Sequence, residues 1–492
     1  MKNVLLILLL FPFLTLSQVQ IGQDIDGEAA KDYSGYTMNL SSDGSIVAIS
    51  AIGATHNDSD GDYSGHVRVF ENQIGTWVQV GQDIDGEQAE DSSNQVSLSS
   101  DGTTVAIGAP GHDGLLGTYS GHVRVFKNQS GTWVQVGQDI DGGSEIEFFG
   151  RSVNLSSDGS IVAIGAPSYY INGGFIEHVR IYENQSGTWV QVGQDIDGEA
   201  GYDGFGRSIS LSTDGTIVAI GAPENDGYED GSGYVRIYEN QSGTWVQVGQ
   251  DIEGEAEDDG FGRSISLSTD GNIIAIGAPQ NDENGVNSGH VRVFENQSGT
   301  WVQVGQDIEG EDANNKSGSS VSLSSDGSIV AIGAQYNDGN AWTTGHVRVY
   351  GNQSGTWVRI IPDIDGEAGG DRSGYSVSLS SDGSIVAIGA FKNNGNGVDS
   401  GHVRVYDLTN PLSIEEFSMS EFSIFPNPTK DQFTIQLNTS SILEKVTIYN
   451  TLGQVVLTSE EMILNTSKLA SGSYVVEITT NKGKASKKLI IE

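Results

Sequence analysis

The feature that most constrains this chain is a 56-residue unit that recurs seven times. Each unit contains the pattern His/Tyr-Val-Arg-Val/Ile-Phe/Tyr, and its arginine marks the same point of every unit. These arginines are Arg68, Arg124, Arg180, Arg236, Arg292, Arg348 and Arg404. A fixed period of this size, rich in glycine and poor in proline, indicates a propeller or a solenoid, in which each unit packs on its neighbours.

Four short strands are predicted in each unit. In the unit around Asp326 they are expected at 320–324, 328–334, 346–350 and 356–360. The second run is apolar at nearly every position, which is typical of a strand packed between two neighbouring sheets. We expect Asp326-Gly327 to form a type I′ turn between the first two strands.

The third and fourth strands are predicted to pair through a turn at 72–75. In this register Phe70 faces Trp77 and Arg68 faces Gln79, so that aromatic rings and a guanidinium share one side. The same residue types recur in every unit, and identical chemistry throughout is what packing requires. We therefore interpret the repeated arginines and tryptophans as structural.

The seventh unit ends after its third strand, at Val405-Tyr406. The missing fourth strand has a counterpart at the other end of the chain, "VQIGQDIDGE" at 19–28, which copies the second half of the repeated "ENQSGTWVQVGQDIDGE". Pairing this strand into the last sheet closes a ring and removes two exposed edges, whereas a solenoid would need capping repeats. The prediction is an all-β protein, a seven-bladed β-propeller closed by its N-terminal strand.

Two segments carry a family resemblance. "FGRSISLSTDGTIVAIGAP" (205–223) and "FGRSISLSTDGNIIAIGAP" (261–279) resemble the FG-GAP repeats of integrin-α-type propellers, which are also seven-bladed. Members of that family often place a calcium loop of the form D-x-D-x-D-G between the two brackets. A short "STDG" hairpin stands there in this chain, so the resemblance does not imply the family's calcium site.

The two ends of the chain differ from the repeats. Residues 1–17 contain an apolar run from Val4 to Leu14 with one preceding lysine, which is typical of a secretory signal peptide. The run is short for a membrane anchor, and we expect no transmembrane segment. We expect the propeller at 18–410, a linker at 411–422 and a small β-sandwich of six or seven strands at 423–492.

The C-terminal segment carries a second resemblance. "FPNPTKDQFTI", "VTIYNTLGQVV", "LASGSYVVEI" and "KKLIIE" are similar to the C-terminal sorting domain (type A) of the type IX secretion system of Bacteroidetes. The resemblance implies that this domain directs the protein across the outer membrane and has the secretion machinery as its partner. The alternative is an ordinary sandwich domain with another use.

The chain is strongly acidic, with a formal net charge of −41, and it has no cysteine. Such a field repels nucleic acids and anionic membrane surfaces, which we exclude as partners. The charge serves either solubility or cation binding. Without cysteine, disulfides, thiol catalysis and cysteine metal sites are excluded as well.

Loops on one face of the predicted propeller vary between units and contain much of the acid. Asp58, Asp60 and Asp62 alternate in "NDSDGD" and are our candidate calcium ligands, because calcium prefers hard oxygen donors. The alternative is a solvated acidic loop. The pairs Asp24 with Asp26 and Asp226 with Asp230 are weaker candidates for the same ion.

The same face carries aromatic residues that do not repeat. We predict that Tyr169, Tyr170 and Trp342 bind a ligand, since exposed aromatic rings stack on sugars or enter protein partners. The alternative for Trp342 is that it folds down over its own blade.

No catalytic motif is recognisable, and we predict no catalytic residue. The sequence predicts a monomeric, secreted or surface-displayed propeller for binding or adhesion, with calcium as the candidate cofactor and a glycan or a surface protein as the ligand. A secreted polysaccharide-acting enzyme and a structural surface-layer component are the alternatives.

Overall fold

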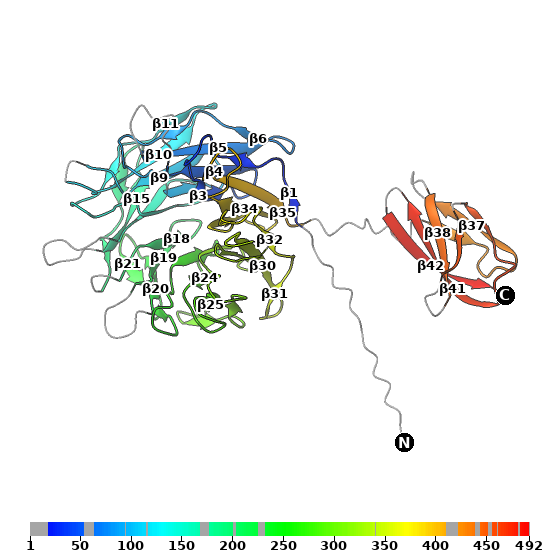
Figure 1. Cartoon of the computed structure of the whole chain (residues 1–492). Helices are drawn as coiled ribbons and strands as arrows, with labels where there is room; N and C mark the ends of the chain where they lie inside the picture. The colour runs from blue at the N-terminus through cyan, green and yellow to red at the C-terminus, as the bar shows by residue number, and fades with distance from the viewer. Residues whose placement is uncertain are drawn as a thin grey trace, which may run out of the picture. The chain divides into compact units, whose positions relative to one another are not determined.

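The computed structural model describes residues 18–491 apart from 54–62, 94, 115–116, 168–176, 200–202, 225–231, 340, 410–421, 438–442, 451–454, 460 and 481–482. This described part is all-β, without a helix. It divides into two compact units, one of residues 18–409 and one of the residues described after 421. Each unit is considered by itself below (Figure 1).

Seven antiparallel sheets form the blades of the first unit, and in each blade the outermost strand is divided into two short segments. Blade one contains β3 (Ser34–Leu40), β4 (Ile46–Ala51), β5 (His66–Asn72), β6 (Trp77–Gln79) and β7 (Ile84–Asp85). Blade two contains β8 (Gln95–Leu98), β9 (Thr104–Ala109), β10 (His122–Asn128), β11 (Trp133–Gln135) and β12 (Ile140–Asp141). Blade three contains β13 (Ser152–Leu155), β14 (Ile161–Ala166), β15 (His178–Asn184), β16 (Trp189–Gln191) and β17 (Ile196–Asp197). Blade four contains β18 (Ser208–Leu211), β19 (Ile217–Ala222), β20 (Tyr234–Asn240), β21 (Trp245–Gln247) and β22 (Ile252–Glu253). Blade five contains β23 (Ser264–Leu267), β24 (Ile273–Ala278), β25 (His290–Asn296), β26 (Trp301–Gln303) and β27 (Ile308–Glu309). Blade six contains β28 (Ser320–Leu323), β29 (Ile329–Ala334), β30 (His346–Asn352), β31 (Trp357–Arg359) and β32 (Ile364–Asp365).

Blade seven is completed from the other end of the propeller. It contains β33 (Ser376–Leu379), β34 (Ile385–Ala390) and β35 (His402–Asp407), with β1 (Val19–Gln20) and β2 (Ile25–Asp26) as its outer strand. Val19 lies opposite Asp407, and the Ile21 amide donates a 2.7 Å hydrogen bond to the Val405 carbonyl. The predicted seven-bladed propeller closed by an N-terminal strand is confirmed.

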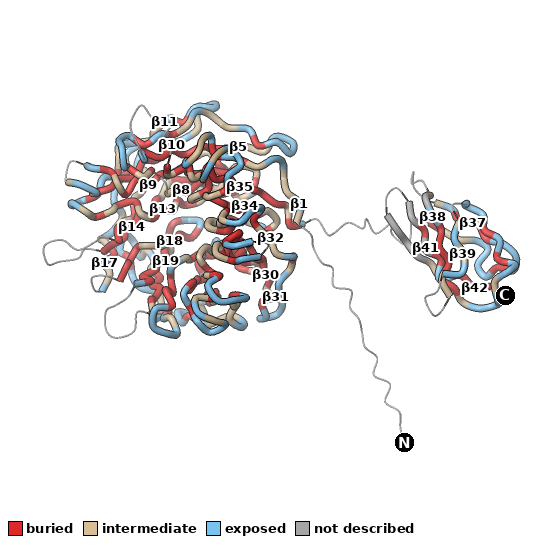
Figure 2. Tube along the Cα trace, in the orientation of Figure 1, coloured by how far each residue is buried: buried red, intermediate tan, exposed pale blue. Residues whose placement is uncertain are grey.

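The core of the propeller lies between neighbouring blades. The second strand of each blade is covered on both sides, and in β29 the side chains of Val330, Ala331 and Ile332 are at most 1% exposed. Burying an isoleucine or valine of this kind contributes about 1.5–3 kcal/mol. Figure 2 shows the buried strands within the blades and the exposed turns around them.

The repeated tryptophans connect consecutive blades. Each indole is about 3–4% exposed and donates its N–H to a backbone carbonyl of the preceding outer strand, as Trp133 does to Val80 at 2.8 Å. The Arg68 guanidinium lies 5.3 Å from the centre of the Phe70 ring. These contacts confirm the structural interpretation of the repeated aromatic and arginine residues.

The predicted register of the third and fourth strands is wrong by two residues. Asn72, and not Phe70, lies opposite Trp77. The turn itself is the two-residue segment Ile74-Gly75, with φ of 55° and 79°, and this pair of positive angles is that of a type I′ turn. A shorter turn moves every following residue along the partner strand.

The Asp-Gly turns also differ from the prediction, but these are longer than the two residues expected. Gly327 has a φ of 69°, but Asp326 has no positive φ, so the turn is not type I′. The Gly327 amide donates to the Ser324 carbonyl, and Ser324 in turn pairs with Ile329 across a four-residue loop. Asp326 acts in this loop through its carboxylate, as discussed below.

The second unit is a β-sandwich with one sheet of three strands and one of four. Its strands are β36 (Phe422–Phe425), β37 (Gln432–Leu437), β38 (Leu443–Tyr449), β39 (Val455–Ser459), β40 (Ile463–Asn465), β41 (Gly472–Thr480) and β42 (Gly483–Ile491). Phe422, Phe433 and Val446 are fully buried between the sheets. The predicted sandwich fold is therefore confirmed.

Candidate functional site

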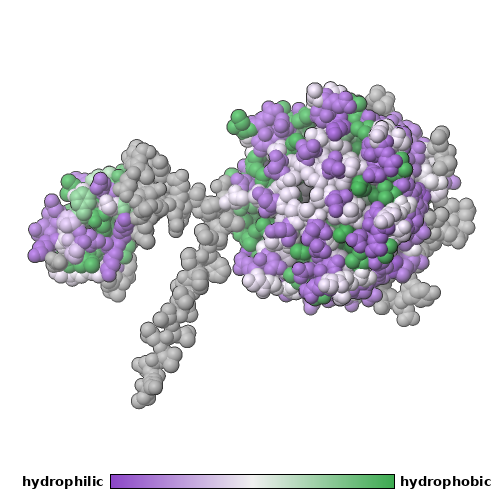
Figure 3. All heavy atoms as spheres, turned by 180° about the vertical axis from the view of Figure 1, so that it is seen from behind, coloured by the Kyte–Doolittle hydropathy of each residue, from purple (hydrophilic) through white to green (hydrophobic). Residues whose placement is uncertain are grey.

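A pocket of about 850 Å³ lies where the innermost strands of the seven blades meet. Residues of β3, β8, β13, β18, β23, β28 and β33 line it, together with residues that precede these strands or follow the second strands. Figure 3 shows a hollow near the centre of the propeller, surrounded by hydrophilic and intermediate rather than apolar residues. Its walls therefore favour a polar ligand.

The Phe-Gly-Arg segment explains how the arginines reach the pocket. Phe205 is fully buried and anchors the chain, and Gly206 follows with a φ of 86°, which glycine adopts without strain. The Gly206 carbonyl accepts a 2.7 Å hydrogen bond from the Ser152 hydroxyl of the preceding blade. Arg207 is thereby directed towards the axis, and Arg151 and Arg263 occupy the same position in blades three and five.

The pocket concentrates positive charge in an acidic protein. Residues 18–409 contain 16 lysines and arginines, of which seven belong to the repeated pattern, and five of the other nine line the pocket. These five are Arg151, Arg207, Arg263, Lys316 and Arg372. The lining has one acidic residue, Glu224, whose carboxylate lies 3.1 Å from Arg207 Nη1.

Arg263 shows the electrostatic consequence. Its side chain is exposed to the lumen but surrounded by the blades; the resulting loss of solvation, followed by the charges of Arg207 and Arg151, lowers the pKa of Arg263 to about 10. Within the described part of the chain, the guanidinium groups of Arg151 and Arg263 form no hydrogen bond or ion pair. An anion in the lumen would relieve this repulsion.

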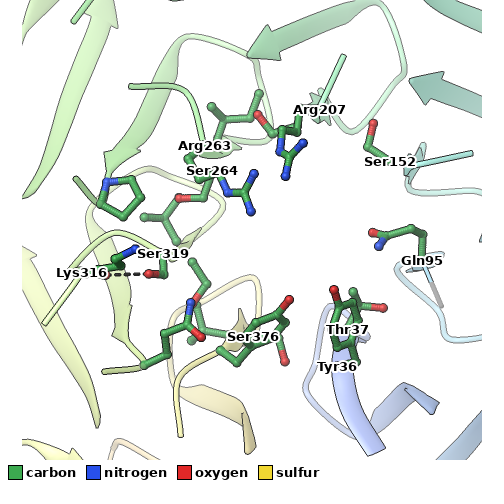
Figure 4. Close-up of a pocket in the computed structure, with 18 of the residues that line it drawn as sticks. Tyr36, Thr37, Gln95, Ser152, Arg207, Arg263, Ser264, Lys316, Ser319 and Ser376 are labelled. Atoms are coloured by element: carbon green, nitrogen blue, oxygen red, sulfur yellow. Dashed lines mark hydrogen bonds between the residues drawn. The ribbon is translucent and has the colours of Figure 1, made fainter. Parts of the chain in front are cut away.

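The opposite wall is aromatic. The ring centres of Tyr36 and Tyr375 are 4.9 Å apart, and Phe391 lies 4.4 Å from Tyr375 and 5.6 Å from Tyr36. Burial, followed by the neighbouring Tyr36, raises the pKa of Tyr375, so its hydroxyl stays protonated near neutral pH. Figure 4 shows Tyr36 across the open centre from the guanidinium groups of Arg207 and Arg263.

The remaining two cations lie on aromatic faces. The Lys316 ammonium is 5.4 Å and the Arg372 guanidinium 4.8 Å from the centre of the Tyr336 ring. Such contacts hold a cation in place while leaving its hydrogen-bond donors available. The pocket therefore combines fixed cations, aromatic rings and hydroxyls, which suits binding of a ring-shaped anion.

Of the sequence-predicted site residues, the structure describes Trp342, which does not line the pocket. Asp58, Asp60 and Asp62 and the tyrosines Tyr169 and Tyr170 fall outside the described residues, so their roles stay predictions. Trp342, between β29 and β30, is 76% exposed and does not fold over its blade. Its role in ligand binding also stays a prediction.

Sequence reasoning missed the pocket arginines. A signal was present, because an arginine follows Phe-Gly in blades three, four and five. The first residues of the inner strands of a propeller converge on the axis, so a cation repeated at this position predicts a basic centre.

Comparison with known proteins agrees with both resemblances. Residues 253–294 match the FG-GAP repeat, and residues 423–492 match the secretion system C-terminal sorting domain. Ulvan lyase NLR42 of Nonlabens ulvanivorans is 38% identical over 78 residues, 15% of this chain and 14% of that protein. An endo-acting ulvan lyase of Formosa agariphila is 36% identical over 89 residues, 16% of this chain and 17% of that protein. The chain thus spans less than a fifth of the length of these relatives.

Solved structures resemble the chain at low identity. Hydrazine synthase of Kuenenia stuttgartiensis has a TM-score of 0.49 at 14% identity, covering 78% of this chain and 97% of that chain. A putative 6-phosphogluconolactonase of Bacteroides uniformis has a TM-score of 0.47 at 15% identity, covering 68% and 85%.

The sorting domain indicates export to the outside or to the cell surface. A search of the described residues for a helix long and apolar enough to cross a membrane finds none. The chain thus contains an FG-GAP repeat within its β-propeller and a C-terminal sorting domain of the type IX secretion system.

Proposed function

We propose that the propeller is an exported binding module whose axial pocket takes an acidic glycan. The observation that carries the proposal is the placement of five cations around a lumen that also has an aromatic wall. Arginine binds carboxylate or sulfate groups through paired hydrogen bonds, and aromatic rings pack on the faces of sugar rings. Neither group of residues alone would favour this ligand class.

Size and charge support the same ligand. A pocket of about 850 Å³ lies in the range of small-ligand sites and accommodates a short oligosaccharide. The net charge of −41 disfavours a polyanion lying across the outer surface, whereas the axis is basic. We therefore expect an acidic chain to enter the pocket with its end.

The test is calorimetric titration of the protein with acidic and neutral oligosaccharides of equal length. We expect acidic ones to bind more tightly, with an affinity that falls as salt is added. Arg263→Gln should weaken binding at least tenfold at an unchanged melting temperature. Arg359→Gln is the matched control, because Arg359 is 45% exposed on the outer strand β31 and pairs with Asp363 there.

Equal affinity for neutral and acidic oligosaccharides would contradict the proposal. So would equal losses in the two arginine variants, since that result would reflect overall charge rather than the pocket.

The second candidate is a polysaccharide-acting enzyme. Its support is the similarity to two ulvan lyases, which extends over 78 and 89 residues. A match of this length does not transfer an activity, so the candidate needs its own measurement. If ulvan chains shorten on incubation with the wild type but not with Arg263→Gln, the pocket is catalytic; if they keep their length while binding, it is a binding site.

A further inference from the structure

A second cluster of functional groups lies outside the axial pocket, in blade five and its connection from blade four. Glu255, Glu283, His290 and Asp307 each offer one ligand atom, and these atoms all lie within 4.8 Å of one another. They come from four separate places: the β22–β23 connection, the β24–β25 loop, the first residue of β25 and the residue before β27. Because they are distant in the sequence, folding of the blade brings them together.

His290 is the buried member of the cluster. Its side chain is fully buried, and neither ring nitrogen has a hydrogen-bond partner among the described residues. Nδ1 lies 3.9 Å from the Asp307 carboxylate, beyond hydrogen-bond distance. A buried polar group without a partner is costly, and a metal ion bound at a ring nitrogen would offset that cost.

The cluster also has more negative than positive charge. Glu309 adds a further carboxylate next to Glu283 and Asp307, and its Oε2 is buried without a hydrogen-bond partner in the described structure. Arg292 is the nearby cation, 3.3 Å from Glu255 and 4.0 Å from Asp307. One guanidinium does not neutralise four carboxylates, so a bound cation would reduce their mutual repulsion.

Comparison of the blades singles out Glu283. Blades six and seven have a glycine at the same position, Gly339 and Gly395. A Cβ on these glycines would lie 3.4 Å from the Asp365 carboxylate and 2.8 Å from that of Asp26. A side chain at this position therefore meets the carboxylate of the outer strand, and in blade five that side chain is itself an acid.

We propose that Glu255, Glu283, His290 and Asp307 bind a divalent transition-metal ion such as Zn²⁺. An imidazole together with carboxylates suits zinc and similar metals, whereas Ca²⁺ prefers a shell of oxygen ligands alone. The ion would connect the β24–β25 loop to the outer strand of its blade. This site is separate from the acidic-glycan pocket and from the calcium ligands predicted at Asp58, Asp60 and Asp62.

The test uses the full chain without a histidine tag, first treated with a chelator and then titrated with Zn²⁺ or Ca²⁺. We expect one Zn²⁺ to bind per chain in calorimetry, with a melting temperature that rises with zinc concentration. Ca²⁺ at equal concentration should bind this site more weakly.

Two variants borrow residues from other blades. Glu283→Gly reproduces the loop position of blades six and seven, and His290→Tyr reproduces Tyr234 of blade four. Each should lower Zn²⁺ affinity at least tenfold. Glu257→Gln is the control, since it removes one exposed charge from the same connection as Glu255 and should leave zinc affinity unchanged.

Absence of Zn²⁺ binding to the wild type would overturn the proposal. Unchanged zinc affinity in Glu283→Gly, or an equal loss in Glu257→Gln, would overturn it as well. Glu283 is exposed, so its variant decides the question even if His290→Tyr fails to fold.

Discussion

Asp326 holds its hairpin together with a single carboxylate oxygen. Its Oδ1 accepts hydrogen bonds from the Ser324 hydroxyl at 2.7 Å, the Ser328 amide at 3.0 Å and the Ser328 hydroxyl at 2.7 Å. The hydrogen bond from the serine hydroxyl to Oδ1 recurs at the equivalent aspartates, which are Asp43, Asp101, Asp158, Asp214, Asp270 and Asp382. One residue type thus shapes the first turn of every blade.

This network predicts a loss of stability in acid. Partial burial tends to raise the pKa of Asp326, but hydrogen bonds from Ser328 and Ser324 outweigh it and hold the pKa below the usual 3.8. A carboxyl whose pKa is depressed by folding contributes stability above about 3.8, and the contribution is lost as pH falls through the folded value. With seven such groups, the melting temperature should fall steeply below pH 4.

Asp326→Asn tests the charge at one turn. We expect the free energy of unfolding to fall by about 1 kcal/mol at pH 7, below the range of about 1.5–3 kcal/mol for bonds to a charged group, because the side chain is exposed. Urea unfolding at pH 7 and at pH 3 measures it. A loss of equal size at both pH values would show that the ionised carboxylate is not the stabilising species.

At the residue scale, the sequence identified packing residues better than binding residues. The repeated tryptophans and arginines can be recognised in the sequence because they recur in nearly every unit, and the structure confirms their packing roles. The pocket arginines are spread over Arg151, Arg207 and Arg263, and each looks like an ordinary polar residue at the start of a strand. Their proximity results from closure of the ring, and its signal in the sequence is the arginine that follows Phe-Gly in three blades.

At the scale of the strand, the N-terminal segment is the element on which the ring depends. Residues 18–28 cover the edge of β35, and the Ile21 carbonyl accepts a 2.8 Å hydrogen bond from the Trp77 indole of blade one. Deleting Gln18–Glu28 removes both contacts and leaves an open sheet edge, which promotes aggregation.

We expect this deletion to abolish cooperative melting, measured by calorimetry, and to cause aggregation, measured by light scattering. Deletion of an equally long stretch from the C-terminal sandwich serves as the control and should leave the propeller transition in place. A monomeric deletion variant with an unchanged transition would contradict the role of the strand.

Element positions followed from the 56-residue period, whereas the details of the turns did not. The third and fourth strands pair two residues away from the predicted register because the turn takes two residues rather than four. Ser-Gly, between the third and fourth strands, and Asp-Gly, between the first and second, can each form a two-residue turn. Whether a two-residue turn or a longer loop forms depends on which side chain hydrogen-bonds to the backbone. That competition is decided in the folded blade.

At the scale of the whole molecule, folding and export belong to separate parts of the chain. The propeller forms its own compact unit, and the sorting domain has its own core around Phe422 and Phe433. A chain truncated after Leu412 should therefore fold when purified, with the melting temperature of the full-length propeller. In a host that has the secretion system it should accumulate in the periplasm, measured by cell fractionation.

The matched control is a reporter protein with residues 1–17 at its N-terminus and residues 413–492 at its C-terminus, which should leave the cell. Arrival of the truncated chain in the medium or at the surface in normal amounts would contradict the assignment of the sorting signal to the C-terminal domain.

The pairing of Val19 with Asp407 also constrains the order in which the blades fold and the ring closes. The first strand to be synthesised, β1, pairs with β35 of the last blade and cannot do so until that blade exists. Six blades can therefore form while the ring is still open. Contacts between such distant positions form slowly, because the entropic cost of closing the intervening chain comes before the contacts stabilise it. Ring closure is thus a natural checkpoint on completeness, since a chain interrupted anywhere before Asp407 never acquires the partner of its first strand.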